Sequence, residues 1–202
     1  MVFAQSPEGY RRSPGKRPPL PVKIIIAGGF GVGKTTSVAS ISDSPPLTTE
    51  ALMTSAGVGV DENSYTPGKR TTTVAMDFGF LTIDEGIKLY LFGTPGQDRF
   101  GFMWGDLIRG ALGAFVIVDP RRIEEGFPAV DYFEEAGLPF AVGVNQFPAE
   151  QHYSLDELRW ALAVDEQIPL IAFDARDKLS VRDALLVVLD QALAFAQGGL
   201  PR

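Results

Sequence analysis

The sequence contains no cysteine and a single histidine, His152, among its 202 residues. The absence of cysteine excludes disulfides, a thiol nucleophile, cysteine-based zinc sites and lipid anchors on sulfur, and it fits a cytoplasmic protein. One histidine cannot build a multi-histidine metal site, and a histidine-centred catalytic triad has little room. Acid–base chemistry would therefore fall to carboxylates or to the positioning of a water molecule.

Long apolar runs and an excess of positive charge are also absent. No apolar run approaches the roughly 18 residues of a membrane span, and no signal-peptide segment follows Met1. The net charge of −7 argues against nucleic acid as the main partner, because neutralising phosphates requires a basic face.

Hydrophobic residues make up 45% of the chain, which is typical of a globular protein. We expect one α/β domain at residues 21–197, flanked by a basic, proline-rich disordered tail at 1–20 and a short tail at 198–202. The basic cluster in the first tail has two interpretations. It is either a solvated extension or a weak contact for anionic lipid or an acidic partner.

The most informative segment is residues 28–35, GGFGVGKT, which follow the pattern G-x-x-x-x-G-K-T and are called the phosphate loop below. A β-branched apolar run at 22–27 precedes it and a helix-like segment at 36–41 follows, which is the context that the motif requires. The glycines let backbone N–H groups surround phosphate oxygens, and the helix N-terminus adds a favourable dipole. The pattern predicts that the chain binds a nucleotide phosphate or descends from a protein that did.

Two side chains of the phosphate loop have expected roles. Lys34 would reach the β- and γ-phosphates, and the Thr35 hydroxyl would bind Mg²⁺. The other nucleotide-binding candidates of this segment are Gly28, Gly31, Val32, Gly33 and Thr36.

The remainder of the chain alternates between strand-like and helix-like segments. Residues 47–70 lack strong periodicity, which is typical of a functional or mobile loop. Residues 73–81 and 87–93 are expected to form a hairpin about the turn at 84–86. Further strands are expected at 114–118, 140–144 and 170–173, and further helices at 128–136, 154–163 and 180–197. This order predicts a mostly parallel six-stranded sheet with one antiparallel edge strand, helices on both faces, and a ligand at the carboxyl ends of the strands.

Two serines are expected to begin helices. Ser154 and Glu157 have the spacing of a capping box. Ser180 is expected to cap the long final helix, which carries leucines at helical spacing.

The order of phosphate loop, Thr-rich segment, hairpin and Gly-Thr-Pro-Gly-Gln at 93–97 resembles the Ras-like small GTPases over residues 21–197. The segments TTTVAMDF at 71–78 and FGTPGQ at 92–97 resemble the bacterial branch that includes MglA, and within it the small GTPases encoded in actinobacterial conservon operons. The resemblance implies a P-loop NTPase fold, GTP or GDP and Mg²⁺ as cofactors, slow GTP hydrolysis, and a molecular switch.

The resemblance also implies partners. A roadblock/LC7-type regulatory protein is expected, and in some cases a pentapeptide-repeat protein. The location is expected to be cytoplasmic, with recruitment to the inner face of the membrane through a partner as an open alternative.

Several residues match functional positions of this family. Thr73 matches the switch threonine that binds Mg²⁺ when γ-phosphate is present, and Thr72 is a rival one residue away. Gly96 matches the glycine whose N–H meets the γ-phosphate, and Gln97 matches the catalytic residue that orients the attacking water. An exposed loop glutamine is the alternative for Gln97. Asn145 and Ala175 match contacts to the base.

Gly93 is the first departure, because the family has an Mg²⁺-holding aspartate there. Asp77 and Gly93 are each eight residues from Glu85, so a symmetric hairpin would place them opposite each other with side chains on the same face. Asp77 could then supply the missing carboxylate to the metal. The rival interpretation is a solvent-facing aspartate on an alternating strand.

The second departure is at the base. The family's N-K-x-D reads Asn145-Gln146-Phe147-Pro148 here, and Pro148 cannot make the paired hydrogen bond that selects guanine. This loss is expected to cost about 2–3 kcal/mol. We therefore expect weak nucleotide binding with reduced guanine preference. A degenerate GTPase that serves as a protein-binding scaffold is the alternative function.

Two further features have open interpretations. Arg99 and Arg70 lie near Gln97 and Thr73 in the sequence and could stabilise a transition state, although each also fits an ordinary surface charge. The apolar cluster after Gln97 fits a partner-binding patch or packing under a helix. Its members are Phe100, Phe102, Met103 and Trp104.

Overall fold

The computed structural model describes residues 18–45, 47–54, 71–96, 103–147 and 153–198, with the backbone alone at 48–54 and 71–75. The strands are β1 Leu20–Gly28, β2 Leu47–Thr54, β3 Thr71–Thr82, β4 Ile87–Gly93, β5 Gly113–Val118, β6 Phe140–Asn145 and β7 Leu170–Phe173. The helices are α1 Lys34–Ile41, α2 Trp104–Leu107, the 3-10 helix η2 Ile123–Gly126, α3 Phe127–Ala136, α4 Leu155–Leu162 and α5 Lys178–Ala196.

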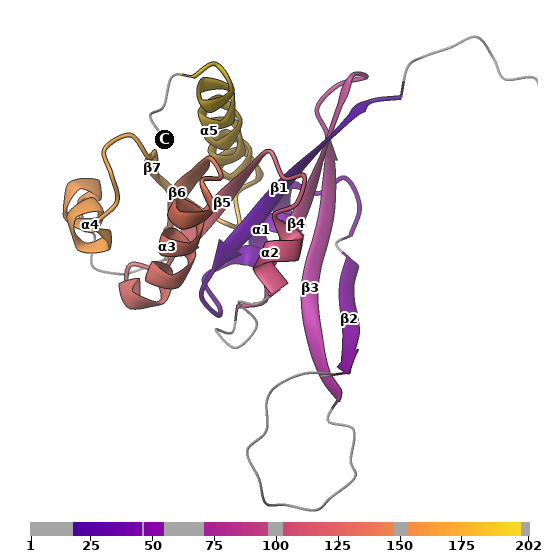
Figure 1. Ribbon diagram of the computed structural model, residues 1–202, viewed down its shortest axis with the longest axis horizontal. Coiled ribbons are helices and arrows are strands. Elements are labelled where there is room, and N and C mark those ends of the chain that lie inside the picture. The colour runs from indigo at the N-terminus through magenta and orange to yellow at the C-terminus, as the bar shows by residue number, and fades with distance from the viewer. Residues whose placement is uncertain (1–17, 46, 55–70, 97–102, 148–152, 199–202) are drawn as a thin grey trace, which may run out of the picture.

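The strands form one sheet in the order β2-β3-β4-β1-β5-β6-β7 (Figure 1). β1 runs parallel to β4 and β5, and the parallel pairing continues through β6 to β7. β3 runs antiparallel to both of its neighbours. The α/β class, the mostly parallel sheet and the single antiparallel strand are thus confirmed.

The expected number of strands needs a correction. The sheet has seven strands rather than six, because residues 47–54 form β2 outside β3. The antiparallel strand is therefore second from the edge. The Thr-rich stretch lacked clear alternation, but its backbone pairs with β3 along eight residues, from Leu47 opposite Phe78 to Thr54 opposite Thr71. Backbone pairing of this kind depends little on side-chain pattern at an edge strand.

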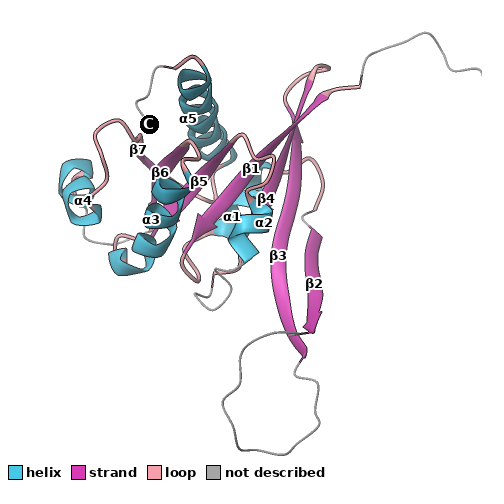
Figure 2. Cartoon of the chain, in the orientation of Figure 1, coloured by secondary structure: helices cyan, strands magenta, loops and turns pink. Residues whose placement is uncertain are grey.

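The sheet buries both faces, because alternate residues of its central strands point to opposite sides. Ile24 and Ile26 of β1 belong to a core that packs against α1 and α5, whereas Ile25 and Ala27 belong to a second core under α3 and α4. Figure 2 shows the helices distributed around the central strands. All six residues of β5 are buried, which fits a strand at the centre of such a sheet.

The β3–β4 hairpin has the expected symmetric register. Phe78 pairs with Phe92 and Gly79 with Leu91, so the position opposite Asp77 is Gly93. The turn is fixed by Asp84, whose Oδ1 accepts hydrogen bonds from the N–H groups of Gly86 at 2.6 Å and Ile87 at 2.9 Å. An aspartate that bonds the backbone two residues ahead is typical of such turns.

One of the two expected helix caps is confirmed and the other is wrong. Ser154 and Glu157 form the complete capping box of α4. In α5 the cap is Asp177, whose carboxylate accepts the N–H of Leu179 at 2.9 Å. Ser180 lies inside the helix and accepts the N–H of Asp174 instead. Both residues are good caps, and the helix begins at the earlier one.

None of the helices in the described part of the chain is long and apolar enough to cross a membrane.

Candidate functional site

The phosphate loop connects the carboxyl end of β1 to the start of α1. Its backbone requires glycine at three positions, because φ is +133° at Gly28, +73° at Gly31 and +113° at Gly33. Space is limiting as well, since a Cβ at Gly28 would lie 2.1 Å from the carbonyl oxygen of Ile117. The motif thus folds as the sequence predicts, at the edge of the sheet where ligands of open α/β folds bind.

Lys34 is buried inside this loop, with 8% of its surface exposed. Its Nζ donates hydrogen bonds to the carbonyl oxygens of Gly28 at 2.8 Å and Gly29 at 2.5 Å. Burial lowers the pKa of Lys34 to about 8, although the charges of Asp77 and Glu125 oppose the shift. The ammonium is therefore held in the centre of the loop with little water around it.

A cavity of about 420 Å³ opens in front of the phosphate loop. Five of its lining residues are sequence-predicted phosphate contacts from the loop and the first turn of α1: Gly31, Gly33, Lys34, Thr35 and Thr36. Gly96 also lines the cavity and lies against the loop, since a Cβ there would lie 2.7 Å from the Nζ of Lys34 and 3.0 Å from the carbonyl oxygen of Gly29. Val32 does not line the cavity, because its side chain is buried in the core with α1 and α5.

Asp77 also lines this cavity, and its Oδ2 accepts a hydrogen bond from the hydroxyl of Thr35. The absent side chain of Gly93 leaves the necessary room, since a Cβ at that position would lie 3.1 Å from the Cβ of Asp77. The structure therefore brings the carboxylate to the hydroxyl expected to bind Mg²⁺, as the hairpin register predicted.

The donor set at this point fits a magnesium ion. Thr35 and Asp77 offer hard oxygen ligands, and Mg²⁺ needs few protein ligands because water and substrate phosphates complete its shell. Thr94 lines the same cavity, and its hydroxyl is buried without a hydrogen-bond partner among the described residues. Within the described ranges no cluster of three acidic or histidine side chains offers an alternative metal site.

We predict that Asp77→Ala weakens GDP binding in the presence of Mg²⁺ by about 10- to 100-fold, as loss of a metal-supporting carboxylate does elsewhere. Binding measured with a chelator should change by less than about twofold. The comparison is made by calorimetric titration, with Asp131→Ala as the control because Asp131 is an exposed acid on α3. Equal Mg²⁺ dependence in Asp77→Ala and the wild type would contradict the assignment.

Thr73 is not brought to this position. Its backbone pairs with Leu52 in the β2–β3 ladder. Since a strand rises about 3.3 Å per residue, Thr73 lies about 13 Å from Asp77 along β3. Its proposed contact with Mg²⁺ stays a prediction, and it requires this end of β3 to take a different path.

Asn145 and Ala175 lie directly behind the phosphate loop. The side-chain amide of Asn145 donates to the carbonyl oxygen of Val32 at 2.9 Å and accepts the N–H of Ala175 at 3.0 Å. Both residues are buried. In this conformation Asn145 therefore ties the phosphate loop to the loop after β7, and its expected contact with a base stays a prediction.

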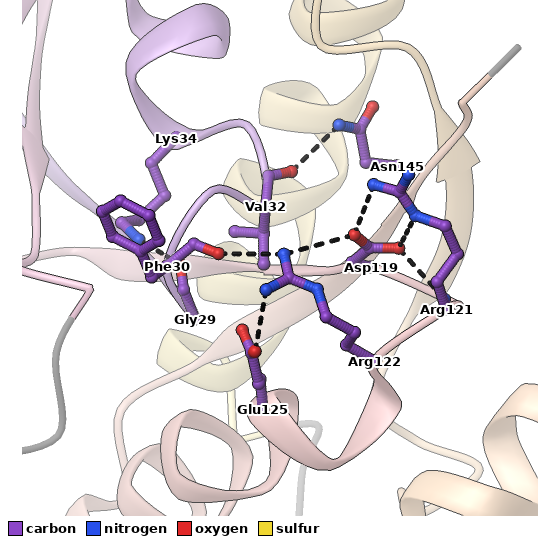
Figure 3. Close-up of polar contacts among 9 residues, drawn as sticks. All are labelled: Gly29, Phe30, Val32, Lys34, Asp119, Arg121, Arg122, Glu125 and Asn145. Carbon is purple, nitrogen blue, oxygen red and sulfur yellow. Dashed lines mark hydrogen bonds and ion pairs between the residues drawn. The ribbon is translucent and has the colours of Figure 1, made fainter.

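A charged cluster that sequence reasoning missed lies on the outer side of the loop (Figure 3). Asp119 at the end of β5 is fully buried and pairs with Arg121 at 2.7 Å and with Arg122 at 3.5 Å. Burial raises the pKa of Asp119, but its hydrogen bonds with Arg121 and the charges of both arginines outweigh that effect and hold the pKa below its usual value. The sequence did offer one sign of this cluster. Asp119 directly follows a buried parallel strand, and residues at the carboxyl ends of such strands often belong to binding sites.

Several expected residues lie outside the described residues, namely Gln97, Arg99, Arg70, Pro148, Phe100 and Phe102. Of the apolar cluster, Trp104 is buried and its ring lies 5.0 Å from that of Tyr132 and 6.0 Å from that of Phe133. For Trp104 the packing interpretation is therefore correct.

In the segment that was expected to contact the base, Gln146 is exposed, and the guanidinium of Arg121 lies 3.8 Å from the ring of Phe147.

Comparison with known proteins agrees with this geometry. The chain is 28% identical over 127 residues to the uncharacterized protein MJ1339 of Methanocaldococcus jannaschii, covering 62% of this chain and 70% of that protein. It is 28% identical over 176 residues to the Ras-related protein RABD1 of Arabidopsis thaliana, covering 82% and 76%. A third match is the human Ras-related protein Rab-3A, 32% identical over 111 residues, which cover 54% of this chain and 41% of that protein.

A protein family, described as "Conserved hypothetical ATP binding protein", matches residues 26–195. The match starts at the end of β1, includes the whole phosphate loop and extends into the last turn of α5. The fold, the loop and the distant Ras-related relatives lead to the same assignment: the chain belongs to this nucleotide-binding family and is homologous to the Ras-related small GTPases.

Proposed function

We propose that this protein is a small GTP-binding switch that binds guanine nucleotides with Mg²⁺ and hydrolyses GTP slowly. The observation that carries the proposal is the contact between Asp77 and Thr35 beside an intact phosphate loop. It supplies a carboxylate at the place where Gly93 lacks one, with space that the glycine provides.

The family match and the Ras-related relatives support nucleotide as the ligand. When bound, Mg²⁺ would neutralise phosphate charge, and Thr35 and Asp77 are the residues that would hold it. Gly96 lines the cavity beside Lys34, and Gln97 follows it directly in the sequence. We retain Gln97 as the residue proposed to orient the attacking water.

The switch role rests on β3. Thr73 is about 13 Å from Asp77 in the present conformation, so binding of Mg²⁺ by Thr73 would require a second conformation of β3 that depends on the γ-phosphate.

The MglA-like sequence of residues 71–78 and 92–97 supports placement in that bacterial branch and among conservon-encoded proteins. A roadblock/LC7-type regulator, and in some cases a pentapeptide-repeat protein, are the partners proposed on the same ground, in a cytoplasmic setting.

A degenerate GTPase that acts as a protein scaffold is the second candidate, and the base side of the site favours it. Both polar ends of the Asn145 amide are engaged within the protein. Gln146 is exposed, and Phe147 lies under Arg121 rather than offering a polar contact. Recognition of guanine is therefore weakened, and most affinity has to come from the phosphate loop.

Calorimetric titration with GDP, a non-hydrolysable GTP analogue and ATP, each with Mg²⁺, separates the two functions. We expect GDP and the GTP analogue to bind, with only a small preference over ATP because the guanine-selecting aspartate is replaced by Pro148. Absence of binding at about 1 mM ligand, where even interactions of about −4 kcal/mol are detected, would reject the switch and leave the scaffold.

A further inference from the structure

The outer side of the phosphate loop carries an arginine that none of the sequence motifs includes. Nη2 of Arg122 donates a hydrogen bond to the carbonyl oxygen of Phe30 at 3.0 Å, across 92 residues of sequence. Figure 3 shows the guanidinium between Phe30, Asp119 and Glu125. Arg122 does not line the cavity, whereas Phe30 and Gly31 do. The contact is therefore made from behind the surface that faces a ligand.

The guanidinium is itself held at two further points. Its Nη1 donates to Oε1 of Glu125 at 2.8 Å, and its Nη2 lies 3.5 Å from the carboxylate of the fully buried Asp119. Glu125 rests against the loop, since a Cβ at Gly29 would lie 2.5 Å from its Oε2. A planar guanidinium can bind several acceptors in one fixed geometry, which a lysine cannot do. Arg122 thus links the phosphate loop to Asp119, which directly follows β5, and to Glu125 of η2.

The consequence for the loop follows from the planarity of the peptide group. The described chain has no cis peptide bond, and in a trans peptide the C=O and N–H groups point in opposite directions. A carbonyl of Phe30 that is held outward by Arg122 therefore turns the N–H of Gly31 toward the cavity. Asn145 has the same effect on the Val32–Gly33 peptide. Its side-chain amide binds the carbonyl oxygen of Val32, so the N–H of Gly33 turns toward the cavity.

We propose that Arg122 is a positioning residue for phosphate binding, which orients the Phe30–Gly31 peptide so that the Gly31 N–H meets a phosphate oxygen. The proposal rests on the proposed function in taking phosphate as the ligand. Arg122 acts through the backbone and does not touch the phosphate. Oriented N–H groups that are fixed before binding form an anion site without further ordering.

The test uses inorganic diphosphate with Mg²⁺ as the probe, which removes any contribution of the base, and measures affinity by calorimetry. Arg122→Ala is expected to bind diphosphate about 10-fold more weakly, the effect of one lost charge-assisted hydrogen bond. Arg122→Lys keeps the positive charge but loses the planar guanidinium that binds several acceptors at once, so about threefold weaker binding is expected. Arg182→Ala removes the same charge from the exposed surface of α5 and should bind as the wild type does. Wild-type affinity in either Arg122 variant would overturn the proposal.

A second readout needs no ligand. The NMR order parameter of the Gly31 N–H bond, measured in the nucleotide-free protein, is expected to fall in Arg122→Ala because the peptide loses its anchor, while that of Val38 within α1 is unchanged. Equal order parameters at Gly31 in the variant and the wild type would overturn the positioning role. If the wild type binds neither diphosphate nor nucleotide, the proposed function fails, and the Gly31 amide still decides whether Arg122 orients this peptide.

Discussion

Lys34→Met is expected to abolish detectable nucleotide binding and, at the same time, to stabilise the ligand-free protein. Binding is lost because the ammonium is the charged group at the centre of the cavity-facing loop. Stability rises because burial lowers the pKa of Lys34 from 10.5 to about 8, which corresponds to about 3 kcal/mol against folding at neutral pH. Losing its two hydrogen bonds to Gly28 and Gly29 offsets about 2 kcal/mol of this gain. A rise in the melting temperature of about 2–4 °C is expected.

The stability difference between Lys34→Met and the wild type should also change with pH in a direction that can be measured. The folded-state pKa of Lys34 lies below its unfolded value, so the destabilisation is fully present below about pH 8 and disappears as the pH rises toward 10.5. The stability advantage of the variant should therefore fall over that range in thermal melts and then reverse, because the two lost hydrogen bonds still count against the variant when the burial term has disappeared. Lys178→Met, which alters an exposed lysine at the start of α5, serves as the control. A destabilised Lys34→Met at neutral pH would contradict the prediction.

Asp119→Asn is expected to destabilise the protein by about 3 kcal/mol, the low end of the range for breaking a buried ion pair. The low end applies because Arg121 and Arg122 are 44% and 40% exposed and can be hydrated when the charge is lost. For a chain of this size the melting temperature should fall by about 6–12 °C. Because the pKa of Asp119 lies below its usual value, its contribution is present above about pH 4 and is lost as the pH falls through the folded-state value.

The matched control is Asp183→Asn. Asp183 also pairs with an arginine, at 2.6 Å from Arg182, but both side chains are more than half exposed. Exposed pairs contribute about 1 kcal/mol or less. Similar melting temperatures for Asp119→Asn and Asp183→Asn would show that the buried carboxylate does not hold the end of β5 and its arginines together.

The parts of the site that sequence reasoning found are those fixed by short-range chemistry. Gly28, Gly31 and Gly33 have the positive φ values that their motif implies. The partnership of Asp77 and Gly93 followed from counting outward from one turn, because a tight hairpin sets its own register. These inferences need only the residues of a single motif or a single hairpin.

The features that the sequence did not predict depend on interactions across the whole fold. Ser180 and Asp177 are three residues apart and both can cap a helix, so local propensity alone could not choose between them. Strand β2 has no side-chain pattern that distinguishes it from a loop, and it forms only because β3 offers a paired backbone. The contact of Arg122 with Phe30 joins residues 92 positions apart, a pairing that no periodicity encodes.

The pairing of Thr73 with Leu52 has a consequence for which nucleotide is preferred. If Thr73 reaches Mg²⁺ only with a triphosphate, ladder hydrogen bonds between β2 and β3 must first break, each contributing about 1 kcal/mol. The apparent affinity for a triphosphate is then its intrinsic affinity multiplied by the small fraction of molecules already rearranged, whereas a diphosphate meets no such reduction. If the proposed switch function holds, a protein partner that binds the rearranged strand would raise that fraction and so increase the apparent affinity for a triphosphate.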